Sequence, residues 1–283
     1  MRKTAQIFNI IMLFHMVGFS QTDVLYKESP MPVDGVETEK SVMNKYIQKK
    51  IVLDHFFNNE INAKTGKPFH YLWTDTAMSG FSQLGELFRS KGAELTTLEA
   101  APTAKNLIDA AVYIIVDPDT KEETLHPNYM TEKSANEIAD WVKKGGVLLL
   151  MTNDLKNAEL DSINILASKF GMRFNKDQLH PVSGRDWEMG ASKNLPDHPL
   201  FKNVNKIYLK DISSITCTNN AKAVLAEGDH VLIATCSYGK GHVYAIGDPW
   251  IYNEYIDHRM LPESFENKKA AENLVEILLS RSE

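Results

Sequence analysis

Residues 239–255 of the chain read Gly239-Lys240-Gly241-His242-Val243-Tyr244-Ala245-Ile246-Gly247-Asp248-Pro249-Trp250-Ile251-Tyr252-Asn253-Glu254-Tyr255. A Gly-Lys-Gly turn leads into an apolar strand, and the strand stops at Gly-Asp-Pro. Polar and aromatic side chains follow at once. Open α/β sheets bind their ligands just beyond the carboxyl ends of the strands. The stretch therefore predicts an α/β architecture and the edge at which a site lies, but it does not name a reaction.

The rest of the chain alternates between apolar strands and amphipathic helices. Residues 110–116 and 147–151 are almost continuously apolar, as strands covered on both faces are. Residues 231–236 and 242–246 flank a turn and predict a hairpin. Further strands are predicted at 51–53 and 95–98, and helices at 79–92, 131–144, 160–170 and 267–280. This alternation predicts a three-layer α/β sandwich whose sheet is mostly parallel and mixed at one edge.

The chain is expected to have three parts. Arg2 and Lys3 precede an apolar run over 7–19, and the small residues after it resemble a cleavage site. We therefore expect a signal peptide over 1–21 and a periplasmic or secreted protein, with an uncleaved anchor as the alternative. Residues 22–48 form a polar lead-in, and residues 49–283 form a single domain. Pro181, Pro196 and Pro199 interrupt residues 172–210, which we expect to run over one end of the sheet.

Composition excludes several classes of function. Of 283 residues, 43% are hydrophobic and 24% are charged, as in an ordinary globular protein. The formal net charge is -6, and the absence of a lysine or arginine cluster argues against nucleic-acid binding. No motif has metal-ligand or phosphate-loop spacing, so we expect no metal and no cofactor. Stable membrane insertion is not expected either. Cys217 and Cys236 can form one disulfide or remain two thiols, and the sequence leaves this open.

Three segments carry a resemblance to a known group of domains. They are 112–120 (VYIIVDPDT), 141–150 (WVKKGGVLLL) and 239–248 (GKGHVYAIGD). They resemble the type I glutamine-amidotransferase-like, flavodoxin-like domain, and more closely its GldG-like branch. Closer still are domains that occur in Bacteroidetes with unsaturated rhamnogalacturonyl hydrolases of glycoside hydrolase family 105. Those versions are similar from about Ile51 to Leu279, including 69–73 and 248–255.

The resemblance implies a context and excludes one chemistry. Amidotransferases carry a nucleophilic cysteine on a sharp strand-to-helix turn, and neither Cys217 nor Cys236 has that setting. The implied context is the breakdown of uronate-containing polysaccharides, such as ulvan or pectin, outside the cytoplasm. The implied substrates are uronate-containing oligosaccharides, and an unsaturated uronyl hydrolase is the implied functional partner.

Polar residues follow four of the predicted strands, so we expect them to meet at one edge of the sheet. One hypothesis is an enzyme that forms 4,5-unsaturated uronides by elimination, as a dehydratase or lyase. This chemistry needs a base, an acid and groups that hold the carboxylate. The catalytic candidates are His70, Tyr71, Asp75, Asp248, Tyr252 and His258. The substrate-binding candidates are Asn58, Trp73, Asp117, Asp119, Asn153, Arg185, Trp250, Asn253 and Arg259.

Most of the candidates also have a structural explanation. Asp117, Asp119, Asp248 and the segment 257–259 can serve as turn residues, and Asn153 with Asp154 can cap the following helix. His70 and Tyr71 can pack as half-buried surface residues, and the tryptophans can belong to the core. The second hypothesis is therefore a non-catalytic module that binds a sugar or a partner enzyme.

Overall fold

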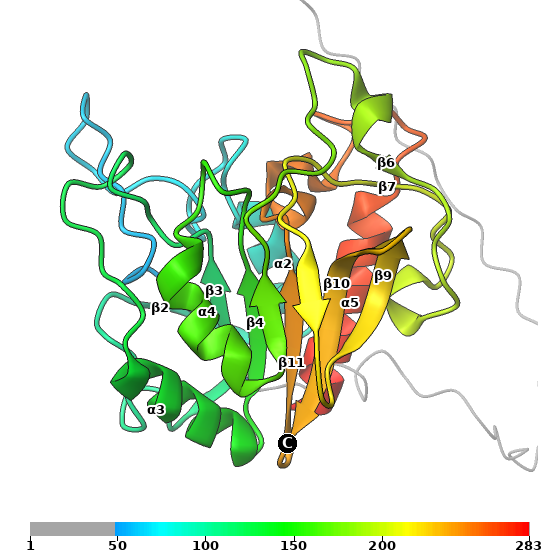
Figure 1. Ribbon diagram of the computed structural model, residues 1–283. Helices are drawn as coiled ribbons and strands as arrows, with labels where there is room; N and C mark the ends of the chain where they lie inside the picture. The colour runs from blue at the N-terminus through cyan, green and yellow to red at the C-terminus, as the bar shows by residue number, and fades with distance from the viewer. Residues whose placement is uncertain (1–48, 283) are drawn as a thin grey trace, which may run out of the picture. The chain divides into compact units, whose positions relative to one another are not determined.

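Five parallel strands form the centre of one large sheet (Figure 1). The computed structural model describes residues 49–282, so the predicted signal peptide and lead-in lie outside the described residues. The five strands are, in spatial order, β2 (Glu94–Leu98), β1 (Lys50–Asp54), β3 (Ala110–Val116), β4 (Val147–Met151) and β11 (Gly241–Ile246). The chain visits β1 first and then places β2 and β3 on opposite sides of it, which makes the gap between β1 and β3 a switch point of the topology.

Antiparallel strands continue the sheet beyond β11. β10 (His230–Tyr238) pairs with β11 as the predicted hairpin, and Gly239 in the turn has φ 62°. This backbone conformation favours glycine, and a Cβ there would lie 2.4 Å from the carbonyl oxygen of Lys143. The outer strands are β8 (Ile215–Cys217), β5 (Met172–Phe174) and β9 (Lys222–Glu227). The sheet is thus mixed at one edge, as the sequence predicts.

Helices cover both faces of the sheet. α2 (Ser82–Ser90) and α5 (Asn267–Arg281) pack on one face, and α3 (Glu132–Lys143) and α4 (Leu160–Lys169) pack on the other. Along β4, Leu149 faces the first helix pair, whereas Leu148 and Leu150 face the second. Each such fully buried side chain contributes roughly 1.5–3 kcal/mol to folding. The continuous apolar runs therefore have the expected cause, which is that both faces of these strands are covered.

The segment between β5 and β8 runs over the carboxyl end of the sheet. It contains η1 (Trp187–Gly190), β6 (Ala191–Ser192), η2 (Pro199–Phe201) and β7 (Ile207–Tyr208). We call residues 175–214 the excursion, which ends four residues beyond the predicted range. On its return, the Ser213 N–H donates to the Gly247 carbonyl at 3.0 Å. A Cβ at Gly247 would lie 1.8 Å from the Ser213 carbonyl oxygen, so glycine is required for this close approach.

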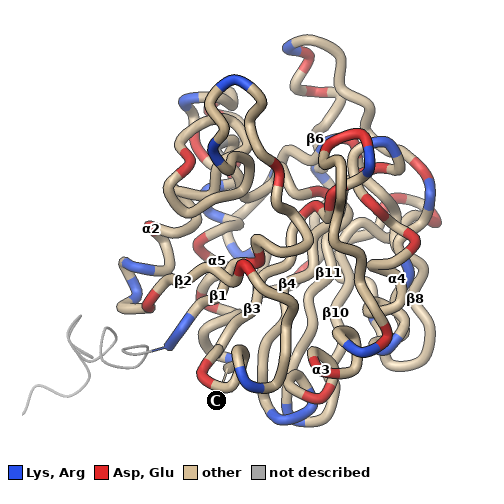
Figure 2. Tube along the Cα trace, turned by 90° about the vertical axis from the view of Figure 1, so that its left-hand side faces the viewer, with Lys and Arg blue, Asp and Glu red and all other residues tan. Residues whose placement is uncertain are grey.

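The two cysteines do not form a disulfide, and Cys217 and Cys236 are both free thiols. No helix within residues 49–282 is long and apolar enough to cross a membrane. Positively and negatively charged residues are interspersed along the described trace (Figure 2).

Candidate functional site

The four strand ends that carry the predicted polar residues lie side by side. Asp54 ends β1, Asp117 follows β3, Asn153 lies two residues beyond β4 and Asp248 two residues beyond β11. Because β1, β3, β4 and β11 are consecutive parallel neighbours, these residues share one edge of the sheet. The predicted convergence of the strand ends is therefore observed.

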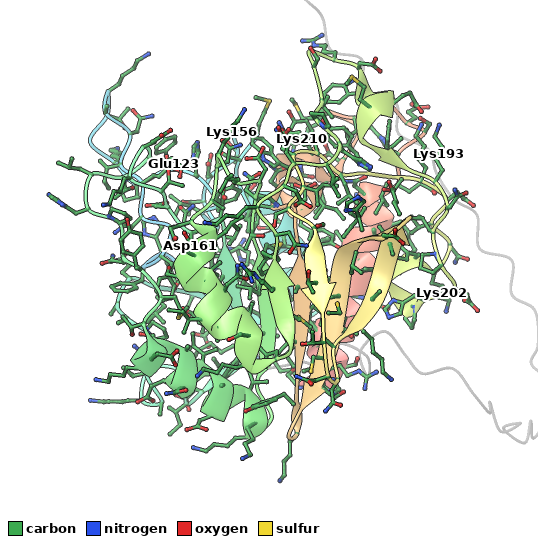
Figure 3. The ribbon with its side chains drawn as sticks, in the orientation of Figure 1. Glu123, Lys156, Asp161, Lys193, Lys202 and Lys210 are labelled. Carbon is green, nitrogen blue, oxygen red and sulfur yellow. The ribbon has the colours of Figure 1, made fainter. Side chains whose placement is uncertain are left out.

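A pocket of about 320 Å³ opens at this edge. Its walls come from the segments that follow β1, β3, β4 and β11 and from the end of the excursion. Glu123 and Lys210, two of its lining residues, lie beyond the carboxyl ends of the strands (Figure 3). The lining residues are His70, Tyr71, Ser79, Asp117, Glu123, Asn153, Asn157, Lys210, Asp211 and Trp250.

The first functional pair in the wall is Tyr71 with Asp117. The Tyr71 hydroxyl donates to Asp117 Oδ2 at 2.7 Å, and Asn153 Nδ2 donates to the same oxygen at 3.4 Å. Both Tyr71 and Asp117 are buried, at 3% and 6% exposure. Burial raises the pKa of the Asp117 carboxyl well above its usual range, and the nearby Glu123 raises it further. Asp117 is thus a carboxyl group that tends to hold its proton beside a phenol.

The second pair is His70 with Glu60. The His70 Nδ1 atom lies 2.8 Å from Glu60 Oε1, and the Glu60 side chain is largely buried. In the tautomer that carries the proton on Nδ1, the imidazole donates this hydrogen bond to the Glu60 carboxylate. Its Nε2 atom then keeps the lone pair and can accept a proton. Glu60, and neither of the predicted catalytic carboxylates Asp75 and Asp248, is the residue that contacts His70 here.

The backbone of the pocket wall is strained. His70 has φ 64°, Tyr71 has φ 46°, Asp117 has φ 45° and Asp211 has φ 51°. Within residues 49–282, seven non-glycine residues have positive φ, and these four of them line the pocket. Each such residue costs on the order of 1–3 kcal/mol and is retained where function or the surrounding fold demands it. The concentration of strain at one pocket marks it as the candidate site.

Asp248 fixes two walls of the pocket without lining it. Its Oδ1 accepts from the Trp250 N–H at 2.6 Å and its Oδ2 from the Lys210 N–H at 2.8 Å. Asp248 is fully buried, and desolvation raises its pKa to about 7. Asp248 therefore holds Lys210 and Trp250 in position from behind, and the prediction of a catalytic role for it is not supported by its place.

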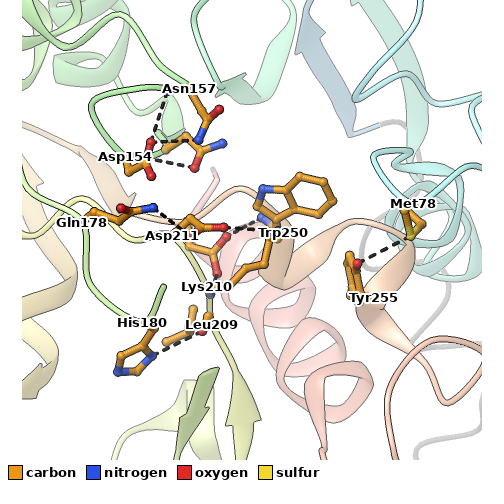
Figure 4. A network of polar contacts seen from close by, with 12 residues as sticks. Met78, Asp154, Asn157, Gln178, His180, Leu209, Lys210, Asp211, Trp250 and Tyr255 are labelled. Atoms are coloured by element: carbon orange, nitrogen blue, oxygen red, sulfur yellow. Dashed lines mark hydrogen bonds and ion pairs between the residues drawn. The ribbon is translucent and has the colours of Figure 1, made fainter. Parts of the chain in front are cut away.

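Lys210 and Asp211, at the end of the excursion, form one side of the pocket together with Trp250 (Figure 4). The Lys210 Nζ atom lies 3.2 Å from Asp211 Oδ2 and 4.2 Å from the centroid of the Trp250 ring. Gln178 donates to the other oxygen of Asp211 at 3.0 Å. Lys210 is the one lysine among the described lining residues, so it supplies the site's ammonium group.

Asp119 and Glu123 add carboxyl groups near the pocket. Asp119 Oδ2 accepts from the Asn59 N–H at 2.9 Å and from the Thr124 hydroxyl at 2.6 Å. Burial raises the pKa of Asp119 to about 6 and also raises the pKa of Glu123. Asp119 does not line the pocket, and its contacts fit the turn explanation given from the sequence.

Five sequence candidates line the pocket: His70, Tyr71, Asp117, Asn153 and Trp250. Other lining or supporting residues were missed, namely Glu60, Ser79, Glu123, Asn157, Lys210 and Asp211. Glu60 lies in the loop after β1, so the expectation of polar site residues after strand ends could have identified it. No sequence pattern indicated Lys210, because its position depends on the path of the excursion.

Three buried candidates have structural roles instead. Trp73 packs against Phe88 of α2 and donates from Nε1 to the Thr96 carbonyl at 3.0 Å, so it belongs to the core. Tyr252 is fully buried in the core beside Asp248. Asn253 Oδ1 accepts from the Tyr255 N–H at the start of η4 (Glu254–Ile256), which follows η3 (Trp250–Tyr252).

Other candidates lie away from the pocket. Asp75 accepts from the Ala77 N–H as a turn residue. His258 is exposed, and Arg259 pairs with Asp257 and lines a different hollow beside α2. Arg185 is exposed on the excursion. The expectation that His258, Arg259 and Arg185 share the cavity is therefore wrong, because the turn after η4 and the middle of the excursion lie outside it.

Asn58 supports the pocket from behind. Its Nδ2 atom donates to the Asp117 carbonyl at 2.7 Å, which helps to hold the left-handed backbone of Asp117. Within residues 49–282, no group of three or more His, Cys, Asp or Glu side chains is arranged so that it could hold a metal ion.

Comparisons with known proteins give a family and a fold. No curated protein sequence matches the chain significantly. The N-terminal domain of mmIFT52 aligns with a TM-score of 0.62 at 15% identity, over 81% of this chain and 97% of that domain. The cytoplasmic protein STM1381 from Salmonella typhimurium LT2 aligns with a TM-score of 0.53 at 14% identity, over 83% of this chain and 100% of that protein. At these identities the likeness shows the fold alone.

The family follows from the sequence. Residues 74–259 match the profile of the family described as "Domain of unknown function (DUF4350)". The match covers more than half of the chain and includes β2, β3, β4, β11 and much of the pocket. The polar pocket at the switch point is thus a feature of a protein that belongs to the DUF4350 family.

Proposed function

We propose that the pocket is the active site of an exported enzyme that acts on uronate-containing oligosaccharides by elimination. The observation that carries the proposal is the arrangement of two consecutive residues, His70 and Tyr71, each paired with its own buried carboxyl group. The His70 pair supplies a proton acceptor and the Tyr71 pair a proton donor, on the wall of one pocket. Elimination next to a carboxylate needs this combination of groups.

The proposed step moves one proton to His70 and one proton from Tyr71. His70 Nε2 takes the proton from C5 of the uronate, and the electrons of the C5–H bond form the C4=C5 double bond. The C4–O bond breaks, and the leaving oxygen receives the proton of the Tyr71 hydroxyl. Asp117 Oδ2 accepts the hydrogen bond of the Tyr71 hydroxyl and so holds the phenol in position. The step leaves His70 protonated and Tyr71 ionised, and solvent restores both.

The carboxylate of the substrate also needs a partner. Removal of the C5 proton moves negative charge onto that carboxylate, and a cation or hydrogen-bond donor lowers the barrier by stabilising the charge. The Lys210 ammonium and the Asn153 amide line the pocket and can serve this purpose. Arg185 and Arg259, which the sequence predicts as substrate-binding residues, do not line this pocket.

The resemblance noted above supports a finer classification. We propose that the domain is glutamine-amidotransferase-like in fold but has lost the nucleophile. Thr152 and Asn153 follow β4 where a reactive side chain could stand, and neither Cys217 of β8 nor Cys236 of β10 lines the pocket. On this proposal the protein works outside the cytoplasm and supplies unsaturated uronides to a uronyl hydrolase.

One observation favours a second candidate, a non-catalytic sugar- or enzyme-binding module. Asp117 Oδ1, on the wall of the pocket, is buried and has no hydrogen-bond partner within the described residues. An unpaired buried polar atom is costly, and a hydroxyl group of a bound sugar can pair with it. Such binding needs no proton transfer.

An absorbance assay separates the two candidates. The mature protein is incubated with uronate-terminated oligosaccharides, and the ultraviolet absorbance of the conjugated double bond is followed. Elimination predicts a rise that is lost in His70→Asn and persists in His258→Asn, a matched change at an exposed histidine. Binding by calorimetry without any rise in absorbance would support the module and overturn the enzyme.

A further inference from the structure

A cluster of aromatic side chains lies beside the pocket and is separate from the two main cores. Tyr208, Tyr255 and Phe265 are its buried members, and Trp187 and Trp250 are half-buried at its margin. Trp187 comes from the excursion, within the Arg-Asp-Trp-Glu segment over 185–188, and the proposed reaction does not use it. Half-exposed tryptophans next to a polar pocket are common in binding surfaces.

The rings form a continuous path from the pocket to Trp187. Trp250 lines the pocket, and its ring centroid lies 5.5 Å from that of Tyr255. The Tyr255 centroid in turn lies 5.9 Å from that of Trp187. Figure 4 shows Trp250 between the Lys210 side of the pocket and Tyr255. Two half-buried indole rings are therefore separated by one buried phenol ring.

Trp187 is held by a rigid local framework. It begins η1, and the next residue, Glu188, pairs with Lys206 and, at 2.9 Å, with Lys193. The Trp187 centroid lies 5.5 Å from that of Tyr208, and a Cβ at Gly190 would lie 2.5 Å from the Tyr208 ring. These contacts fix the position of the indole without covering it completely.

Arg185 lies two residues before Trp187 in the chain. The backbone N–H of Trp187 donates to the Arg185 carbonyl at 3.0 Å, and Arg185 is exposed. An aromatic face with a neighbouring guanidinium is suited to a sugar unit that carries a carboxylate, because the apolar sugar face stacks and the carboxylate pairs with the cation.

The volume of the pocket shows why an oligosaccharide would need a second binding place outside it. At about 320 Å³ it is near the lower end of the range for small-molecule sites, so it suits one sugar unit. The following units of an oligosaccharide must then lie on the adjoining surface, and the path through Trp250 and Tyr255 leads to Trp187.

We propose that Trp187 and Arg185 form an outer subsite that binds an acidic sugar unit of an oligosaccharide whose terminal unit occupies the pocket. The proposal rests on the proposed function for the identity of the ligand. It makes the protein selective for longer acidic oligosaccharides over disaccharides.

Calorimetry tests the outer subsite without turnover. The starting protein is Tyr71→Phe, in which the acid is removed. This protein and the three double variants that add Trp187→Ala, Trp187→Phe or Arg185→Ala are each titrated with a uronate-terminated disaccharide and tetrasaccharide. The tetrasaccharide is expected to bind about tenfold more tightly than the disaccharide. Trp187→Ala should remove this gain, Trp187→Phe should keep most of it, and Arg185→Ala should reduce it, all without changing disaccharide affinity.

The outcomes separate this proposal from the proposed reaction. Equal affinities for both lengths, or a length-dependent gain that survives both Trp187→Ala and Arg185→Ala, would overturn the outer subsite even if the absorbance assay shows elimination. A gain that depends on Trp187 would support the subsite even if no double bond is formed. Because Arg185 is exposed, the protein with Arg185→Ala should fold normally. This variant therefore keeps the test decisive even if the protein with Trp187→Ala is unstable.

Discussion

The Tyr71 hydroxyl lies 2.7 Å from Asp117 Oδ2, and both residues have left-handed backbone conformations. Tyr71 follows β1 by a long loop, whereas Asp117 directly follows β3. The two therefore meet at the gap between β1 and β3, where the order of the strands reverses. The fold thus holds a phenol and a carboxyl group together at the place where doubly wound sheets bind ligands.

Tyr71→Phe should lower elimination by about 10²- to 10⁴-fold, the usual contribution of a general acid. The ring and its packing against Phe81 remain, so the loss should come from the missing proton rather than from unfolding. Initial rates of absorbance increase give the effect. Tyr129→Phe, at an exposed tyrosine, is the control and should leave the rate unchanged. Equal rates in both variants would remove Tyr71 from the mechanism.

Glu60→Gln should lower the rate nearly as much as loss of His70, although Glu60 is expected to touch no substrate. A glutamine can donate to His70 Nδ1, which would move the imidazole proton to Nε2 and abolish the acceptor. The pH dependence of kcat/KM should change together with the rate. Glu132→Gln, on the exposed first turn of α3, serves as the control. If Glu60→Gln retains the wild-type pH profile, Glu60 has a packing role and does not set the tautomer of His70.

Asp54 should make the folded protein less stable as pH rises from about 4 to about 7. Burial raises the pKa of Asp54 from 3.8 to about 7, so the native state holds more protons than the unfolded state in this window. The stabilisation is complete below the unfolded pKa and is lost as pH rises through the folded pKa. Each such group contributes a slope of up to about 1.4 kcal/mol per pH unit. Asp248 acts in the same direction.

Chemical denaturation of the wild type and Asp54→Asn at pH 5 and pH 7 measures this slope. The variant should show a smaller difference between the two pH values, because its amide does not titrate. Asp109→Asn changes an exposed carboxylate and should leave the slope as it is. A wild-type slope retained in Asp54→Asn would show that Asp54 is ionised in the folded protein throughout.

Gly247→Ala should destabilise the protein by about 1–3 kcal/mol or more, because the new Cβ would clash with the Ser213 carbonyl. The displacement should also shift Asp248 and thereby Lys210, so KM should rise. Gly228→Ala meets no atom within 4 Å but has φ 57°, so it should cost only about 1–2 kcal/mol. Equal midpoints for the two variants in urea would argue against the close approach.

The sequence predicted the centre of the fold better than its edges. The strands over 110–116 and 147–151 were predicted with their observed bounds, because covered strands are apolar throughout. The strands β5, β8 and β9 were not predicted, since β5 and β8 have only three residues each and β9 is largely exposed. The pairing of β5 with β8 also joins distant parts of the chain. The hairpin of β10 and β11 was predicted because its turn is local.

The site was predicted in part for the same reason. Asp117 and Asn153 follow apolar strands directly, so their place at the sheet edge could be derived from local pattern. Lys210 reaches the pocket through the excursion, whose path is set by the bridge between Leu179 and Ile212 and by contact with Gly247. Arg259 was assigned wrongly, because the turn that follows η4 carries it toward α2.

A crystal structure of Tyr71→Phe with a uronate-terminated tetrasaccharide tests the central claim most directly. The account predicts that the terminal uronate occupies the pocket, with C5 facing His70 Nε2 and the carboxylate against Lys210 and Asn153. A sugar bound elsewhere on the surface, or bound in the pocket with C5 turned away from His70, would contradict it.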